Sequence, residues 1–292
     1  MKALIDSDLV AFRCAASCQK QGVLTEDFGV ATSRANNLLV SILEATGATD
    51  RQLYLSGGEN FRKKINPLYK ANRTDQPRPE YLEPLREWLV TEWGATVTDG
   101  IEADDAMGIA QSVSPSGETV ICSLDKDMLQ VPGHHYSWEI QGTGSTGIPW
   151  KKEAKSSHVS VQQGLFNFYW QLVMGDAADN VPGYDGKMRA KVPKFLEPHY
   201  ENMACMETEQ ELFEYVLELY QLPVLDLLTN GACLWIQRTK GDNWLPRGKQ
   251  LLMNTPLERS ITVEPGQLDD LIHSSLQLFE QELDVGNQSM TA

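Results

Sequence analysis

The sequence predicts an α/β fold built on a doubly wound, mainly parallel sheet. Four short apolar runs, at residues 3–5, 52–55, 95–98 and 119–122, have the length of strands, and helix-compatible segments separate them. Acidic residues follow the first, third and fourth of these runs. From residue 165 onward the residue pattern changes, and apolar residues recur with a helical period. Strands that alternate with helices indicate parallel βαβ units, here followed by a helical part.

The individual elements follow from local patterns. The first strand ends at Asp6, and the second is closed by Ser56-Gly57-Gly58, residues that favour turns. Between the third and fourth strands, small apolar residues over 103–113 have a helical spacing. Residues 165–174 are aromatic with a helical period. Glu209–Tyr220 carries apolar residues three and four apart, which is the pattern of an amphipathic helix.

Composition limits the class of protein. The chain has 292 residues, of which 41% are hydrophobic, and its formal net charge is −15. That hydrophobic content excludes a disordered chain, and the longest apolar-rich stretch, residues 165–174, is too short to span a bilayer. Asp6 and Asp8 interrupt the apolar segment that a signal peptide would need. Five cysteines without CxxC spacing favour a reducing compartment, so we expect a cytoplasmic protein that does not bind membranes.

Acidic residues gather where the predicted strands end. In an open parallel sheet, the carboxyl ends of the strands form one edge, and this edge holds the ligand site. We therefore expect three acidic clusters to converge there, with a fourth in the turn GDAADNVPG at residues 175–183. The clusters are Asp6 and Asp8, then Glu102, Asp104 and Asp105, then Asp125 and Asp127, and finally Asp176 and Asp179.

Converging carboxylates indicate bound cations. Two unit charges about 4 Å apart cost roughly 4 kcal/mol at an effective dielectric constant of 20. Ligation by oxygen alone suits Mg²⁺ or Mn²⁺, and two such ions about 3.5–4 Å apart are the usual machinery of phosphodiester hydrolysis. Taken singly, each cluster has a simpler reading as the first turn of a helix or a solvated loop. Their repetition after successive strands favours a metal site.

Two basic segments interrupt this acidic chain. FRKKINPLYKANR, residues 61–73, carries five positive charges and no acid, and the second segment follows the turn at residues 180–183. Cations interleaved with aromatic rings suit phosphate contacts and base stacking, and backbone N–H groups in a glycine turn can face a phosphate. The alternative is that each segment is a solvated helix face. The predicted DNA-contacting residues are Arg62, Lys63, Lys64, Tyr69, Lys70, Arg73, Gly183, Lys187, Arg189 and Lys191.

Five motifs together resemble those of the 5′-nuclease superfamily, which comprises flap endonucleases, bacteriophage 5′→3′ exonucleases and the N-terminal nuclease domain of DNA polymerase I. The phage exonucleases are the most similar. The motifs occur in the family's order within residues 4–196. They are LIDSD (4–8), FRKKINPLYKANR (61–73), GIEADDAMG (100–108), SLDKDMLQ (123–130) and GDAADNVPG (175–183).

The resemblance implies a domain arrangement. Residues 1–160 would form a PIN-like nuclease core with a basic arch at about 57–90. Residues 161–235 would form a helical part with a helix–three-turn–helix element that grips duplex DNA. Residues 236–292 would be a C-terminal extension to which the resemblance assigns no role.

The resemblance also implies roles for individual residues. Two Mg²⁺ ions, for which Mn²⁺ can substitute, would be bound, and the helix–three-turn–helix element would hold a monovalent cation. Lys70, Arg73 and Asp125 would be catalytic. The ligands of the first ion would be Asp6, Glu102, Asp104, Asp105, Asp125 and Asp127, and those of the second would be Asp176 and Asp179.

The sequence departs from the family pattern at three places. Many members carry an aspartate at the end of the second strand, where this chain has Ser56 and Gly57, so that one ligand is missing or Glu59 acts through water. A Gly-rich GxGxKTA-like stretch is replaced by YDGKMRAKVPK at residues 184–194. Asp8 matches only some phage members.

These observations lead to an expected function and two alternatives. We expect a Mg²⁺-dependent 5′→3′ exodeoxyribonuclease with structure-selective flap endonuclease activity. It would be a monomer that acts on 5′ ends, duplexes or flap junctions alongside replication proteins, in the host cytoplasm if a phage encodes it. One alternative is a ribonuclease H-like 5′-nuclease that removes RNA primers. The other is a catalytically impaired protein that binds branched DNA.

The net charge does not exclude a DNA partner. Nine acids belong to the proposed site, and residues 197–226 carry eight more acids without any Lys or Arg. Setting both groups aside leaves a slightly positive remainder, which includes the two basic segments.

Overall fold

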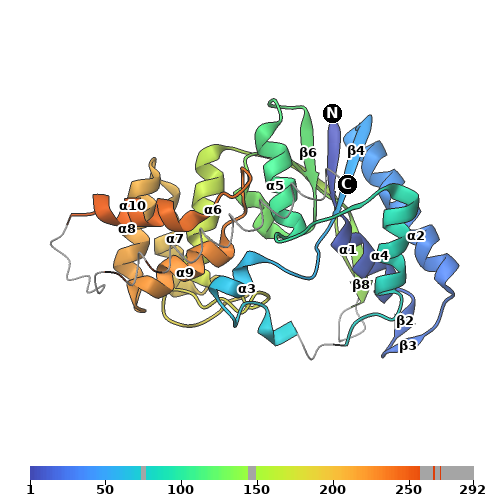
Figure 1. The fold of residues 1–292 in the computed structure, drawn as a ribbon, viewed down its shortest axis with the longest axis horizontal. Coiled ribbons are helices and arrows are strands. Elements are labelled where there is room, and N and C mark those ends of the chain that lie inside the picture. Colours follow the sequence, from blue (N-terminus) through green and yellow to red (C-terminus); the bar gives the residue numbers. More distant parts are fainter. Residues whose placement is uncertain (74–76, 144–148, 257–265, 267–269, 271–292) are drawn as a thin grey trace. The chain divides into compact units, whose positions relative to one another are not determined.

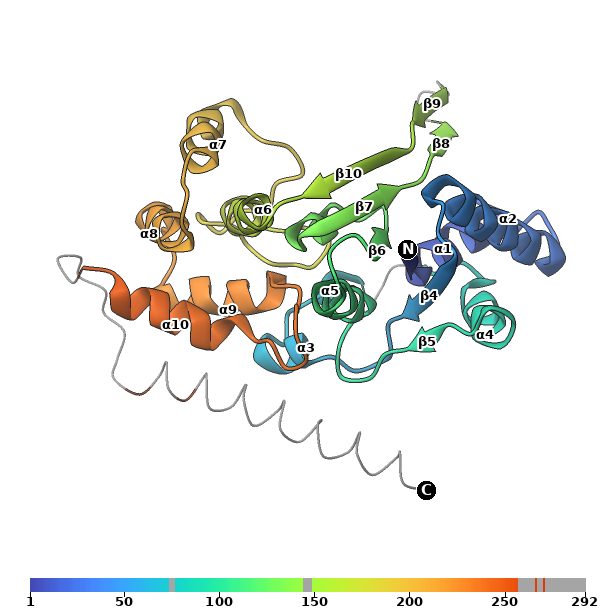
Figure 2. The same cartoon turned by 90° about the horizontal axis from the view of Figure 1, so that it is seen from above.

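A computed structural model describes residues 1–73, 77–143, 149–256, 266 and 270. Figure 1 shows its helices and strands along the chain, and Figure 2 shows them after a 90° turn. They form two compact units, residues 1–58 with 77–160 and residues 59–76 with 161–292. Part of the segment that the sequence assigns to the arch, residues 59–76, thus groups with the helical unit.

The first unit contains a six-stranded sheet with the strand order β10-β7-β6-β1-β4-β5. Every neighbouring pair is parallel except β7 and β10, which are antiparallel, so the predicted mainly parallel sheet is confirmed. The third predicted strand is short, with only two residues. The strands are β1 (Lys2–Asp6), β4 (Asp50–Leu55), β5 (Thr96–Val97), β6 (Thr119–Cys122), β7 (Gly133–Ser137) and β10 (Lys155–Val159).

Helices cover both faces of this sheet. Alternate residues of β1 point to opposite faces. Ala3 and Ile5 pack into a core cluster with residues of α1, α2 and α4, while α5 packs against β1, β4 and β6. This is the doubly wound arrangement that the sequence predicts. The helices are α1 (Ser7–Ala16), α2 (Phe28–Thr46), α4 (Leu82–Trp93) and α5 (Ala103–Val113), and the small hairpins are β2 (Gln19–Lys20) with β3 (Val23–Leu24) and β8 (Ile140–Thr143) with β9 (Pro149–Lys152).

The strand register brings the ends of the central strands together. Ile5 of β1 lies opposite Leu53 of β4 and Cys122 of β6. The residues that follow these three strands therefore meet at one edge of the sheet. This edge carries Asp6, Ser56 and Ser123.

The second unit is helical around an aromatic core. Phe168, Tyr169, Phe213, Trp235 and Trp244 are buried in one cluster. A Cβ at Gly231 would lie 2.3 Å from the Trp244 ring, so a glycine is needed for α9 to approach α10. The helices are α3 (Phe61–Ile65), α6 (Val161–Met174), α7 (Glu197–Ala204), α8 (Glu209–Leu219), α9 (Val224–Leu234) and α10 (Trp244–Asn254), with short 3-10 helices at Ala71–Arg73 and Lys194–Leu196; a third, Lys126–Gln130, belongs to the first unit.

The helical unit contains the predicted amphipathic helix and part of the C-terminal segment. The amphipathic helix predicted at Glu209–Tyr220 is α8, which begins with a capping box of Thr208 and Glu211. Residues 236–256 belong to the segment for which the sequence suggested no role, and α10 within it buries Trp244 and Leu245 in the core. Residues 257–265, 267–269 and 271–292 lie outside the described part of the chain. None of the helices in the described part is long and apolar enough to cross a membrane.

Candidate active site

Asp6 lies at the carboxyl end of β1, where it also caps α1. Its Oδ1 accepts a hydrogen bond from the Leu9 N–H at 3.1 Å, and its Oδ2 accepts one from Ser123 Oγ at 2.7 Å. The side chain is buried. The pKa of Asp6 is raised to about 7, mainly by burial and also by the charges of Asp8 and Asp125, although the hydrogen bonds from Ser123 and Leu9 act to lower it. Its raised pKa and its place at the sheet edge make Asp6 a candidate functional residue.

Ser123 connects the ends of β1 and β6. Its hydroxyl donates to Asp6 and accepts from the Asp125 N–H at 3.0 Å. Asp125 in turn caps the 3-10 helix Lys126–Gln130, since its Oδ1 accepts from the Asp127 N–H at 2.9 Å. The structure therefore brings the first and third acidic clusters together. Ser123 belongs to the SLDKDMLQ motif, but nothing in the sequence pattern points to this linking role.

The second acidic cluster begins α5. Glu102 is the N-cap and Asp105 the third helical residue, and Asp105 Oδ2 accepts from the Glu102 N–H at 3.1 Å in a capping box. Both side chains are buried, and Asp104 is half-buried. Glu102 and Asp105 therefore do cap a helix, as the simpler interpretation of this cluster had it. The capping box also fixes the direction of their two carboxyl groups.

Asp8 is held by groups that the sequence reading missed. Its Oδ2 accepts from the Ser56 N–H at 2.8 Å, and its Oδ1 is paired with Arg86 of α4. Ser56 lies in the segment, Ser56-Gly57, where the resemblance led us to expect an aspartate. A lone arginine in a helix gives no motif, so Arg86 has no sequence signal by which it could have been found.

The carboxyl edge of the first unit fits a divalent cation in its chemistry. The side-chain atoms there that could bind a metal ion are oxygens, and the charges of Asp8 and Asp125 act on Asp6. Among the described residues, no three His, Cys, Asp or Glu side chains form a group that could hold an ion by themselves. Mg²⁺ generally keeps several waters and uses one or two carboxylates, so a preformed protein cage is not required.

In the second unit, Asp176 organises the turn that follows α6. Its Oδ1 accepts from the N–H groups of Ala178 and Asp179 at 2.7 and 3.1 Å, and its Oδ2 accepts from Gln171 Nε2 at 3.1 Å. The side chain is buried. Asp176 thus shapes the turn that carries Asp179, as an aspartate typically does in such turns.

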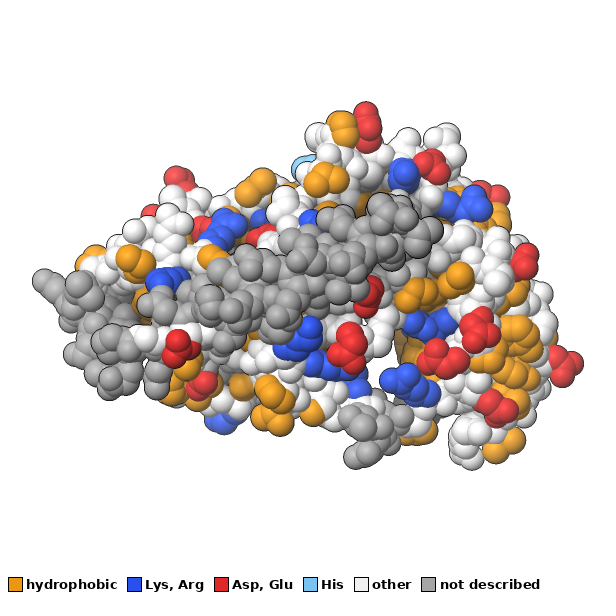
Figure 3. Space-filling view, viewed as in Figure 1, with side chains coloured by type: hydrophobic (Ala, Val, Ile, Leu, Met, Phe, Trp, Pro, Cys, Tyr) orange, Lys and Arg blue, Asp and Glu red, His pale blue; other side chains and the backbone are white. Residues whose placement is uncertain are grey.

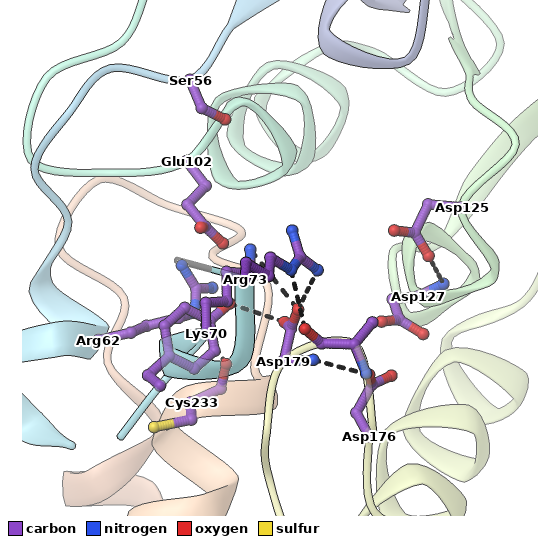
Figure 4. A network of polar contacts seen from close by, with 12 residues as sticks. Ser56, Arg62, Lys70, Arg73, Glu102, Asp125, Asp127, Asp176, Asp179 and Cys233 are labelled. Carbon is purple, nitrogen blue, oxygen red and sulfur yellow. Dashed lines mark hydrogen bonds and ion pairs between the residues drawn. The ribbon is translucent and has the colours of Figure 1, made fainter. Parts of the chain in front are cut away.

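Asp179 is bound by the residues predicted to be catalytic. Figure 4 shows Lys70 and Arg73 pointing toward its carboxylate. Arg73 Nη2 lies 2.7 Å from Asp179 Oδ1 and Lys70 Nζ 3.7 Å from it, while the Tyr69 hydroxyl donates to Oδ2 at 2.8 Å. Both residues also bond to the backbone of the turn, through the Lys70 N–H to the Asp179 carbonyl and Arg73 Nε to the Ala178 carbonyl.

Two residues of the first basic segment are buried. Arg62 is 2% exposed, and its guanidinium donates to the carbonyl oxygens of Cys233 and Trp235 at 2.8 and 2.7 Å, at the end of α9. Tyr69 is equally buried, with its hydroxyl on Asp179. This burial does not support the predicted DNA contacts of Arg62 and Tyr69. Lys63, Lys64 and Arg73 are exposed.

The second basic segment is partly offset by an acid that the sequence reading overlooked. Arg189 donates to both oxygens of Asp185, at 2.8 and 2.5 Å, and Lys187 Nζ lies 3.5 Å from the same carboxylate. The hydrogen bonds from Arg189 lower the pKa of Asp185 to about 2. On the face drawn in Figure 3, Lys and Arg side chains are likewise interspersed with Asp and Glu. Lys187 and Lys191 are exposed.

Gly183 contributes close packing to the turn. Its N–H, predicted to face a phosphate, donates to the Lys187 carbonyl at 2.9 Å. A Cβ at Gly183 would lie 2.4 Å from the Val173 carbonyl oxygen. The predicted phosphate contact through this N–H is therefore not supported, because the group is already used.

Comparison with known proteins identifies the family. Residues 2–157 match the family described as "5′-3′ exonuclease, N-terminal resolvase-like domain". The 5′-3′ exonuclease of Buchnera aphidicola subsp. Schizaphis graminum (strain Sg) is 32% identical over 160 residues, which are 52% of this chain and 53% of that protein. DNA polymerase I of Bacillus caldotenax is 28% identical over 195 residues, 63% of this chain and 22% of the polymerase. The match thus spans about half the length of the first relative.

Solved structures show the same fold. A bacteriophage T5 protein co-crystallised with metal ions has a TM-score of 0.53 at 14% identity, covering 95% of this chain and 98% of its own. The bacteriophage T5 flap endonuclease in a complex with DNA and metal ions has the same TM-score and identity, with 96% and 99% covered. The T5 structures show the fold, and the family match over residues 2–157 shows that the chain belongs to the 5′-3′ exonuclease family of the 5′-nuclease superfamily.

Proposed function

We propose that the chain is a Mg²⁺-dependent DNA nuclease with 5′→3′ exonuclease and structure-selective flap endonuclease activity. The observation that carries this proposal is the Ser123 hydroxyl, which joins the buried Asp6 to Asp125 at the carboxyl edge of the sheet. A buried carboxylate beside two others is stabilised in its charged form by a cation. The DNA and metal ions of the T5 flap endonuclease complex, and the names of the relatives, agree with this class of substrate and cofactor.

The residues that would hold Mg²⁺, with Mn²⁺ as a substitute, are those of the two acidic regions. Bound ions of this kind activate water and offset phosphate charge. We assign one ion to Asp176 and Asp179, and the other to the sheet-edge residues Asp6, Glu102, Asp104, Asp105, Asp125 and Asp127.

Individual side chains of the protein would have distinct roles in this activity. The Ser123 hydroxyl holds the Asp6 carboxylate in one orientation, and Asp125 is fixed by the backbone of Asp127. Lys70 and Arg73 supply positive charge against the charge that develops on the phosphate. The exposed Lys63, Lys64, Lys187 and Lys191 would bind the DNA backbone, so that substrate shape rather than base sequence is selected.

The test is cleavage of 5′-labelled substrates by the full chain. Matched flap, blunt duplex and RNA–DNA hybrid substrates are incubated with EDTA, Mg²⁺ or Mn²⁺. We expect cleavage of DNA flaps and 5′ ends only with a divalent ion, and Asp125→Asn should reduce the rate at least about 10²-fold while DNA binding persists. Asp50→Asn, at the opposite end of β4, is the control and should cleave normally. Preference for the hybrid would favour the ribonuclease alternative, and binding without cleavage would favour the impaired binding protein.

A further inference from the structure

Arg86 joins three elements of the first unit at the carboxyl edge of the sheet. It extends from α4, and its guanidinium donates to the Asp8 carboxylate of α1 and to the Ser56 carbonyl that follows β4. Its Nε lies 3.4 Å from Glu83 Oε2 on its own helix. The Arg86 side chain is 20% exposed and that of Asp8 29%, so this pair is more enclosed than a typical surface ion pair.

Ser56 is the point where these contacts meet. Its N–H donates to Asp8 Oδ2 at 2.8 Å, its carbonyl accepts from Arg86, and its hydroxyl oxygen accepts from the Ala103 N–H at 3.0 Å. Ala103 is the first residue of α5, where backbone N–H groups lack partners within the helix. The Ser56 hydroxyl supplies one, and so connects the Asp8–Arg86 pair to the start of α5.

The next position along the chain leaves no room for a side chain. A Cβ at Gly57 would lie 2.1 Å from the Thr98 carbonyl oxygen. Of the two positions directly after β4, only residue 56 therefore has room for a side chain. This chain places a serine there and brings in the carboxylate of Asp8 from α1, with Arg86 to balance its charge.

We propose that Arg86 is a positioning residue for the acidic edge of the sheet. It fixes Asp8 and the Ser56 backbone relative to one another, and through the Ser56 hydroxyl it fixes the start of α5, which carries Glu102, Asp104 and Asp105. It also offsets the charge of Asp8 beside Asp6. The inference rests on the proposed metal-binding function of that edge.

The two contacts made by residue 86 require an arginine at that position. An arginine presents two N–H donors in a rigid fork and reaches both the Asp8 carboxylate and the Ser56 carbonyl, whereas a lysine keeps the charge as a single point. Arg86→Lys therefore removes the geometry but not the charge. Ser56→Ala removes only the connection to Ala103, and is the smaller change of the two.

The test measures Mg²⁺ binding to the full chain without DNA, by titration calorimetry, beside kcat and KM on a DNA flap. Loss of an outer contact to a metal site typically costs about 10–100-fold in affinity or activity. We expect Arg86→Lys and Ser56→Ala each to weaken Mg²⁺ binding and lower kcat about tenfold, with KM for DNA unchanged. The double variant should be no worse than about the more affected single variant, because both act through the start of α5.

Arg78→Lys is the matched control. Arg78 forms an exposed ion pair with Glu83, and its substitution should leave Mg²⁺ binding and kcat unchanged. Mg²⁺ affinity and kcat within about twofold of the unmodified chain in both Arg86→Lys and Ser56→Ala would overturn the inference. Should Arg86→Lys fail to fold, Ser56→Ala alone decides it. An unmodified chain that neither binds Mg²⁺ nor cleaves DNA would overturn the proposed function as well, whereas an active chain indifferent to both changes would overturn only the role of Arg86.

Discussion

Arg73 and Asp179 form an ion pair, with 2.7 Å between Nη2 and Oδ1. A cation expected to meet a phosphate is thus bound to a carboxylate expected to meet a metal ion. Lys70 shares the same carboxylate, and the left-handed backbone of Lys70, with φ of 55°, lets its N–H reach the Asp179 carbonyl. Residues 69–73 and the turn at 176–180 are therefore one connected structure, in which the proposed metal ligand Asp179 and the proposed phosphate-binding groups Lys70 and Arg73 compete for partners.

This competition predicts opposite effects of Asp179→Asn on binding and cleavage. The substitution removes the counter-charge of Lys70 and Arg73, so DNA binding in EDTA at low salt should tighten about threefold or more, since more positive charge is available to phosphates. Cleavage with Mg²⁺ should fall, because a proposed ligand is lost. Fluorescence anisotropy in EDTA and a flap-cleavage assay measure the two quantities. Weaker DNA binding in EDTA would contradict the competition. Asp50→Asn, which removes an exposed acid elsewhere, is the control.

Arg62 and its neighbour Lys63 should respond differently to alanine. Arg62→Ala leaves the buried carbonyls of Cys233 and Trp235 without these donors, so the free energy of unfolding should fall by about 3 kcal/mol. Lys63 is exposed, and Lys63→Ala should change the free energy of unfolding by no more than about 0.5 kcal/mol. It should weaken DNA binding, and the slope of the logarithm of the binding constant against the logarithm of the salt concentration should become shallower by about one. Urea unfolding and salt-dependent anisotropy make the comparison. Equal stability of the two variants would show that Arg62 does not hold α9.

Gly183→Ala should destabilise the turn after α6. The added Cβ would lie 2.4 Å from the Val173 carbonyl oxygen and 2.8 Å from the Gly175 N atom, so the backbone must shift. We expect a loss of about 1–3 kcal/mol in unfolding free energy. Gly29→Ala in α2 meets nothing within 4 Å and should be neutral or slightly stabilising. Thermal melts of both variants test this, and a Gly183→Ala chain as stable as the unmodified one would refute the close approach.

The sheet and its acidic edge could be predicted because they depend on local patterns. Apolar runs identified β1, β4, β5 and β6, and acids follow all of these except β4. A parallel arrangement requires the carboxyl ends of these strands to lie at one edge of the sheet. The structure confirms this sheet, and the Ser123 hydroxyl hydrogen-bonds both the Asp6 carboxylate and the Asp125 N–H there.

The contacts that hold the site could not be predicted because they join distant residues. Arg62 lies in a segment that looks like an exposed basic face, yet its partner carbonyls are 171 and 173 residues away. Arg86 and Ser123 have no pattern of their own, since one arginine on an amphipathic helix and one serine after a strand are common. Their importance comes from the folded register, which a single sequence does not reveal.

The buried Asp6 predicts an unusual dependence of stability on pH in the metal-free chain. Its pKa is raised to about 7, mainly by burial, so the folded state holds this proton more tightly than the unfolded state. The stabilising contribution is complete below about pH 4 and is lost as pH rises to about 7, amounting to on the order of 4 kcal/mol. In EDTA at pH 8, the charged Asp6 should therefore lower the melting temperature of the unmodified chain.

Asp6→Asn isolates this contribution, because asparagine can keep the Leu9 and Ser123 contacts without a charge. At pH 8 in EDTA the variant should melt at a higher temperature than the unmodified chain, and near pH 4 the two should melt alike. Mg²⁺ should stabilise the unmodified chain at pH 8 more than the variant, and the variant should not cleave DNA. Asp50→Asn changes an exposed carboxyl whose pKa is lowered by Lys2, so it should not reproduce this pattern. A variant less stable than the unmodified chain at pH 8 would mean that the charged Asp6 is already compensated by the fold without a bound ion.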